Sequence, residues 1–201
     1  MRYLIALICS LSLSNVWADI TLTIHDQNDQ PVSNAVVSLS GSFVSTPDAV
    51  EKMNQIHSAF VPRVLIVQKD QYVSFPNSDD IRHHVYSFSI PKAFEIKLYK
   101  GSEIPPIQFD APGMVVLGCN IHDSMIGYIY VADNEYTVKT DKNGQVTLPA
   151  KLGDKVSVWS ERLIEGVTSE KMIEITNDTA QTVKLELLPP IEAIDHSSHR
   201  Y

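Results

Sequence analysis

The sequence predicts an all-β protein, and three features of its 201 residues support this class. Helical periodicity is rare, whereas short runs alternate between apolar and polar residues, as expected of strands that bury one face. Gly, Pro, Asn and Asp separate these runs at the intervals typical of a β-sandwich. The runs are too numerous for one small sandwich, so we expect two β-domains.

Thirteen segments carry the alternating pattern. They are residues 20–24, 35–40, 63–68, 71–75, 83–89, 94–99, 114–119, 126–131, 136–140, 145–148, 155–160, 170–176 and 181–188. Residues 47–58 are the one stretch in which we expect a short helical turn.

The first 18 residues, MRYLIALICSLSLSNVWA, predict a secretory signal peptide. Arg2 precedes an apolar run, and Val16-x-Ala18 is a small-residue end of the kind that signal peptidase cuts. The run is too short to span a bilayer, and no later segment reaches the roughly 18 apolar residues of a membrane helix. We therefore expect an exported, periplasmic protein without membrane insertion.

The charge of the chain limits the classes of partner. It carries 16 Lys and Arg residues against 24 Asp and Glu residues, a formal net charge of −8. An acidic surface argues against nucleic acid as a partner and against anionic membranes. It fits a soluble partner protein that carries a basic patch.

Cys119 is the only cysteine outside the predicted signal peptide, which contains Cys9. In an oxidising compartment a lone cysteine is a buried inert thiol, half of an intermolecular disulfide, a nucleophile or a metal ligand. The segment CNIHDSM favours a metal ligand, because His122 and Met125 follow Cys119 at short intervals.

A copper site that transfers electrons needs a thiolate, two imidazoles and a weak axial ligand such as a thioether. The sequence offers this set on two elements. His83 begins one predicted strand. Cys119 ends another, and His122 and Met125 follow it on a short loop. We therefore expect these four side chains to meet at one copper ion.

The segment that contains these residues resembles the cupredoxins, or type 1 (blue) copper proteins. Phe60-x-Pro62, Asn77, His83-x-Val85 and Cys119-x-x-His122-x-x-Met125 are similar to the plastocyanin and amicyanin pattern, and the last has amicyanin-like spacing. FPNSDDIRHHVYSFS, FEIKLY, APGMVVLGCNIHDSM and GYIYV resemble a group of cupredoxin-domain proteins labelled methylamine utilisation proteins. The resemblance covers residues 53–132.

The resemblance implies a cupredoxin-like Greek-key β-sandwich that binds one type 1 copper ion. Its ligands would be the imidazoles of His83 and His122, the thiolate of Cys119 and, as the long axial ligand, Met125. Strand alternation places His83 and His84 on opposite faces, so only one of them can point at the metal. The His-x-Val pattern of the cupredoxins selects His83. His84 would then orient the ligands from outside the copper, against the backbone near Asn120.

Two residues depart from the cupredoxin pattern. Asp123 and Ser124 stand where proteins with this loop usually have a proline and close relatives an aromatic residue. A carboxylate beside His122 favours Cu(II) and so lowers the reduction potential. It also makes the exposed histidine edge less apolar.

The two ends of the chain resemble the halves of a carboxypeptidase-regulatory-like (prealbumin-type) β-sandwich. Pro31-Val32-x-x-Ala35 is similar to its first strand, and Thr140-Asp141-x-x-Gly144 to its hairpin. We therefore expect the following order: signal peptide 1–18, N-terminal strands 19–42 that join the second sandwich, cupredoxin domain 43–132, second β-sandwich 133–188 and polar tail 189–201. Two sequential domains are the alternative arrangement.

From these features we expect an exported type 1 copper protein that carries single electrons in the periplasm, to and from a soluble redox partner. An enzyme is not expected, because the site has no open coordination position and no carboxylate pair or Ser–His arrangement stands out. Two alternatives stay open. One is a periplasmic copper-handling protein that does not cycle, and the other is a binding module that copper stabilises.

Overall fold

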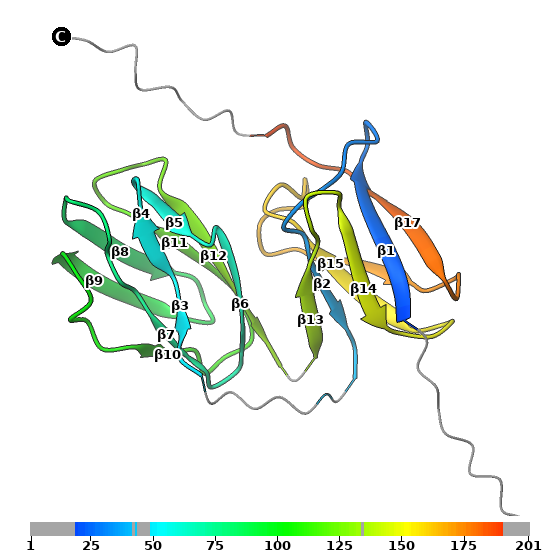
Figure 1. Cartoon of the computed structure of the whole chain (residues 1–201), viewed down its shortest axis with the longest axis horizontal. Helices are drawn as coiled ribbons and strands as arrows, with labels where there is room; N and C mark the ends of the chain where they lie inside the picture. The colour runs from blue at the N-terminus through cyan, green and yellow to red at the C-terminus, as the bar shows by residue number, and fades with distance from the viewer. Residues whose placement is uncertain (1–18, 42, 44–48, 134, 191–201) are drawn as a thin grey trace, which may run out of the picture.

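The computed structural model describes residues 19–41, 43, 49–133 and 135–190 (Figure 1). The predicted signal peptide, residues 1–18, and residues 191–201 of the predicted tail lie outside the described residues. Seventeen strands and no helix occur within the described ranges, which confirms the all-β prediction. Accordingly, no helix in this part of the chain is long and apolar enough to cross a membrane.

Seven strands, here called the flanking domain, lie on the right of Figure 1. They are β1 (Asp19–Asp26), β2 (Val36–Leu39), β13 (Tyr136–Lys139), β14 (Gln145–Pro149), β15 (Lys155–Trp159), β16 (Lys171–Glu174) and β17 (Ala180–Leu185). A three-stranded sheet has the order β14-β1-β17, and a four-stranded sheet has the order β13-β2-β15-β16. Strand β1 shows why the layers form: Ile20, Leu22 and Ile24 point to one face and are fully buried in a core that both sheets share.

The flanking domain is built from two distant parts of the sequence. Strand β1 pairs with β14, where Leu22 lies opposite Val146. Strand β2 lies between β13 and β15, so that Val37 is opposite both Val138 and Val158. The chain therefore leaves this domain after β2, forms the other sheets, and returns with β13.

The remaining ten strands form the central domain, on the left of Figure 1. They are β3 (Glu51–Lys52), β4 (Asn54–Ile56), β5 (Ala59–Val61), β6 (Val64–Gln68), β7 (Tyr72–Ser74), β8 (His83–Phe88), β9 (Ala93–Tyr99), β10 (Ile107–Gln108), β11 (Gly113–Gly118) and β12 (Ile126–Ala132). The sheets have the orders β6-β12-β11-β8-β9, β10-β7-β3 and β4-β5. One buried cluster fills the space between them, with Val85, Leu117 and Ile129 from the large sheet and Val73 from β7.

The helical turn expected within residues 47–58 is wrong for the part that the structure describes. Strands β3 and β4 lie within this stretch, with Met53 and Gln55 fully buried at alternate positions. His57 and Ser58 follow with φ values of 53° and 56°. Two consecutive positive φ values are those of a tight hairpin turn, which joins β4 to β5.

The outer face of the large sheet packs against the flanking domain. A buried cluster combines Tyr128 and Tyr130 of β12 with Val36 and Trp159 of the flanking domain. The rings of Tyr128 and Trp159 lie 5.3 Å apart between centroids. The Tyr130 hydroxyl accepts a hydrogen bond from Ser38 Oγ at 3.2 Å, which adds a polar link between the domains.

Candidate metal centre

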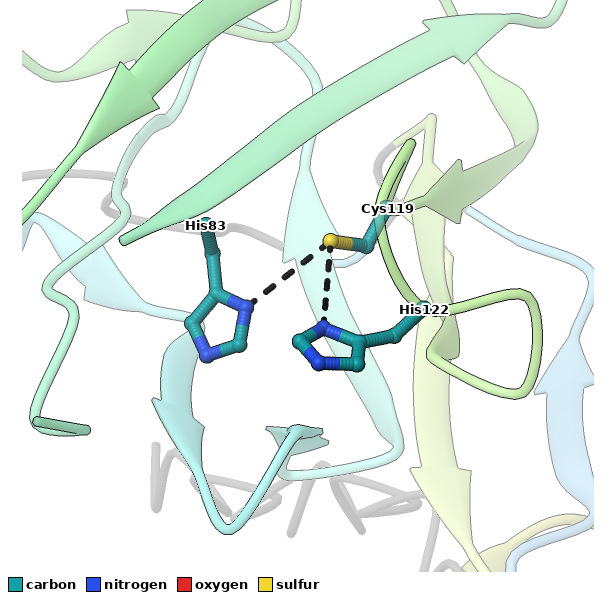
Figure 2. Close-up of side chains that lie close together, drawn as sticks. All are labelled: His83, Cys119 and His122. Atoms are coloured by element: carbon teal, nitrogen blue, oxygen red, sulfur yellow. Dashed lines mark hydrogen bonds between the residues drawn. The ribbon is translucent and has the colours of Figure 1, made fainter. Parts of the chain in front are cut away.

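Three of the four predicted ligands lie together at one end of the central domain (Figure 2). The Cys119 Sγ atom is 3.8 Å from Nδ1 of His83 and 3.9 Å from Nδ1 of His122. The ring centroids of the two histidines are 5.1 Å apart. Figure 2 shows both rings turned toward the sulfur atom, so that three potential ligand atoms point into one small space.

Neighbouring strands place these side chains. Strands β8 and β11 are adjacent in the large sheet, with Tyr86 opposite Gly118. His83 begins β8 and Cys119 follows the last residue of β11, so the antiparallel pairing of these strands brings both residues to the same end of the sheet. The loop of residues 120–125, here called the ligand loop, then carries His122 to the same place.

The site has a buried side and an exposed side. His83 is fully buried and Cys119 is 3 % exposed, whereas His122 is only partly buried. Met125 is 1 % exposed and belongs to the same buried cluster as Cys119. Its backbone N–H donates to the carbonyl of His122 at 3.0 Å, which closes a turn in the ligand loop. Solvent therefore reaches the site from the His122 side.

Asp79 fixes the buried imidazole. Its Oδ2 atom lies 2.7 Å from Nε2 of His83 and accepts the backbone N–H of Ser58 at 2.8 Å, and its Oδ1 atom accepts that of His57. Burial raises the pKa of Asp79, but the hydrogen bonds from Ser58, His83 and His57 together hold the pKa below its usual value. An ionised carboxylate can only accept a hydrogen bond, so Nε2 of His83 donates to Asp79, and Nδ1 is the ring nitrogen on the side of Cys119.

This role of Asp79 was not predicted from the sequence. The role depends on the β4–β5 hairpin, whose turn presents two N–H groups to the carboxylate. A carboxylate four residues before His83 is the signal that the sequence contained. Asn77 holds the segment between Asp79 and His83 in place, because its side-chain amide donates to the carbonyls of Ile81 and Tyr99 at 2.9 and 3.0 Å.

His84 has a different partner from the one expected. The sequence predicted that it lies against the backbone near Asn120. In the structure, Nε2 of His84 is 2.9 Å from Oε1 of Glu95 on the neighbouring strand β9. Glu95 lies opposite Tyr86, so His84 and Glu95 are diagonal neighbours on one face of the sheet. His84 therefore bonds to Glu95 on the face of the strand that points away from the three ligand atoms.

The donor set fits copper. A thiolate, two imidazole nitrogens and a thioether are the ligands of a soft or borderline transition metal, whereas Mg²⁺ and Ca²⁺ prefer oxygen ligands. The combination of one cysteine and two histidines with a methionine nearby is that of blue copper sites in particular. The residues that could hold the ion are His83, Cys119, His122 and Met125.

No family model and no curated protein matches this chain. Among solved structures, the copper-containing nitrite reductase from Thermus scotoductus SA-01 is 23 % identical, with a TM-score of 0.40, over 48 % of this chain and 25 % of that chain. A reduced Cu(I) form of an amicyanin mutant is 16 % identical, with a TM-score of 0.39, over 48 % of this chain and 98 % of that chain. The purple cupredoxin from Nitrosopumilus maritimus is 18 % identical, with a TM-score of 0.36, over 42 % of this chain and 100 % of that chain. The neighbours thus include cupredoxins, the family that the sequence resembles.

Proposed function

We propose that this chain is an exported type 1 copper protein that carries single electrons. The observation that carries the proposal is the position of the Cys119 thiol, 3.8 and 3.9 Å from the two Nδ1 atoms of His83 and His122. Met125, buried in the same cluster as Cys119, would be the axial ligand. Bound copper would supply a one-electron couple between Cu(I) and Cu(II).

The residues around the site keep the ligands in place. His83 is fully buried and hydrogen-bonded to Asp79, while Cys119 and Met125 pack in the hydrophobic core. Ligands held in this way move little when the charge of the site changes, which suits rapid electron transfer. The partly exposed His122 provides the shortest way to a partner at the surface.

The proposal does not include enzyme activity. Three strong protein ligands and an axial sulfur leave a copper ion without the open position that a catalytic metal needs for water or substrate. A carrier that exchanges electrons with a soluble protein is therefore the better fit. The formal net charge of −8 favours a partner with a basic surface, and the predicted signal peptide supports a periplasmic location.

A copper-handling protein that does not cycle is the second candidate. The burial of both sulfur ligands, Cys119 and Met125, favours it, because soft sulfur ligands bind Cu(I) well. Such a protein would hold Cu(I) tightly and form no stable coloured Cu(II) state. The third candidate is a binding module in which copper only stabilises the fold. In that case Cys119→Ser would leave partner binding intact.

A titration of the purified protein with Cu(II), followed by visible absorption, tests the proposal. We expect one copper ion per chain and an intense thiolate-to-copper absorption band. Cys119→Ser should abolish the band. His84→Ala is the matched control, because this histidine adjoins His83 but pairs with Glu95, and it should keep the band. A colourless wild-type protein that takes up Cu(II) weakly would contradict the electron-carrier function.

A further inference from the structure

The flanking domain reaches the ligand loop through one guanidinium group. Arg63 precedes β6, and Glu161 follows β15, 98 residues later. Nε of Arg63 donates to both carboxylate oxygens of Glu161 at 3.0 and 2.9 Å, and Nη2 donates to Oε2 at 2.7 Å. The remaining nitrogen, Nη1, donates to the carbonyl of Ile126 at 3.2 Å. Arg63 thus joins a carboxylate of the flanking domain to the residue that follows Met125.

A cleft lies between the two domains at this point. It has a volume of about 680 Å³ and is lined by Asp123 and Ser124 of the ligand loop, and by Asn34 and Ser160 of the flanking domain. Arg63 and Glu161 line the same cleft. The outer side of the ligand loop therefore faces a space rather than a packed core, and the ion pair forms part of the wall of that space.

Arg63 is well placed to act as a rigid link. Its guanidinium carbon lies 5.7 Å from the centre of the Tyr128 ring, and its carbonyl accepts the backbone N–H of Tyr128 at 2.9 Å. Surface ion pairs contribute little on average, but a planar guanidinium that forms two parallel bonds to a carboxylate is the geometry in which they matter. Lysine cannot reproduce this arrangement.

The carbonyl of Ile126, to which Arg63 donates, belongs to the residue after Met125, the predicted axial ligand. Ile126 is the first residue of β12, and its own N–H donates to the carbonyl of Ser124 at 3.1 Å. Met125 precedes it and is buried in the central core. A shift of the Ile126 carbonyl would move the backbone that carries the Met125 sulfur, which is the weakest and most easily displaced ligand of such a site.

We propose that Glu161 of the flanking domain is a positioning residue for the copper site, acting through Arg63 on the Ile126 carbonyl and so on Met125. This inference rests on the proposed function. It gives the flanking domain a part in the properties of a site to which it contributes no ligand. Coupling of this kind is reciprocal, so a molecule that binds in the cleft and breaks the ion pair would also change copper binding.

Three variants of the full chain test the proposal. Glu161→Gln removes the charge, and Arg63→Lys keeps the charge but lacks the planar fork that binds Glu161 and Ile126 together. Lys184→Gln is the control, since Lys184 forms an ion pair with Asp29 at 2.6 Å in the flanking domain. We expect the first two to lower Cu(II) affinity about tenfold in a competition titration and to change the copper hyperfine splitting, while the control does neither.

The melting temperature separates positioning from packing. If Glu161→Gln and Arg63→Lys lower the melting temperature but keep the wild-type affinity and spectrum, the ion pair only holds the domains together and the proposal is wrong. If Glu161→Gln fails to fold, Arg63→Lys decides in its place. Glu161→Asp should restore most of the affinity. Failure of the proposed function would be visible separately, as a wild-type protein without the thiolate-to-copper band.

Discussion

The two imidazoles of the candidate copper site are held in opposite ways. On the His83 side, the ring is fully buried, and a carboxylate that is itself fixed by a hairpin turn orients it. On the His122 side, the ring is partly exposed and sits on a loop that borders a cleft. The difference fits the proposed electron carrier, in which the buried side would fix the geometry of the metal and the exposed side would meet the partner.

Removal of each imidazole in turn should give the largest difference between the His83 side and the His122 side. We expect both His83→Gly and His122→Gly to lose the thiolate-to-copper band. Added imidazole should restore it in His122→Gly, because solvent reaches that position, but not in His83→Gly, where the core and Asp79 enclose the ring. Visible absorption during an imidazole titration measures this. Equal rescue of both variants would show that the two sides do not differ in access.

Asp79→Asn should have the next largest effect. The amide keeps the shape of the side chain but loses the charge that orients His83, and partners of this kind typically account for about 10- to 100-fold in metal affinity. The reduction potential should also rise, because a negative charge near the site favours Cu(II). Competition titration and voltammetry measure the two effects.

Asp80→Asn is the matched control for Asp79→Asn. Its side chain is fully exposed, with a relative accessibility of 109 %. This change should leave the affinity and the potential as they are in the wild type. The same loss in both variants would indicate a general charge effect rather than orientation of His83.

Asp123→Asn tests the exposed side and should have the smallest effect. Asp123 adjoins His122 but is open to solvent, where a pair of unit charges typically contributes up to about 1 kcal/mol. We expect a small rise of the potential that added salt removes, since salt screens exposed charges far more than buried ones. A shift as large as that of Asp79→Asn, and independent of salt, would contradict the distinction between the two sides.

The sequence was informative wherever a pattern is local. Thirteen alternating segments correspond to strands of the structure, and the motif around Cys119 pointed to the residues that come together. The short strands β3, β4, β5 and β10 were missed, because runs of two or three residues are too short to show a period.

Contacts between distant segments could not be predicted. Asp79 has its role only because a hairpin turn from residues 57 and 58 folds over it. The bond between Arg63 and Glu161 joins positions 98 residues apart, and neither residue stands out in its own segment. His84 meets Glu95 because β9 lies beside β8 with Glu95 opposite Tyr86, a register that the sequence alone does not give.

A redox titration of the copper-loaded protein, followed by electron paramagnetic resonance, tests the central claim most directly. We predict a Cu(II) signal with the narrow hyperfine splitting of a thiolate-bound type 1 site, which one electron per chain removes and reoxidation restores. A signal with the wide splitting of ordinary Cu(II), unchanged in Cys119→Ser, or a reduced state that cannot be reoxidised, would contradict an electron carrier at this site.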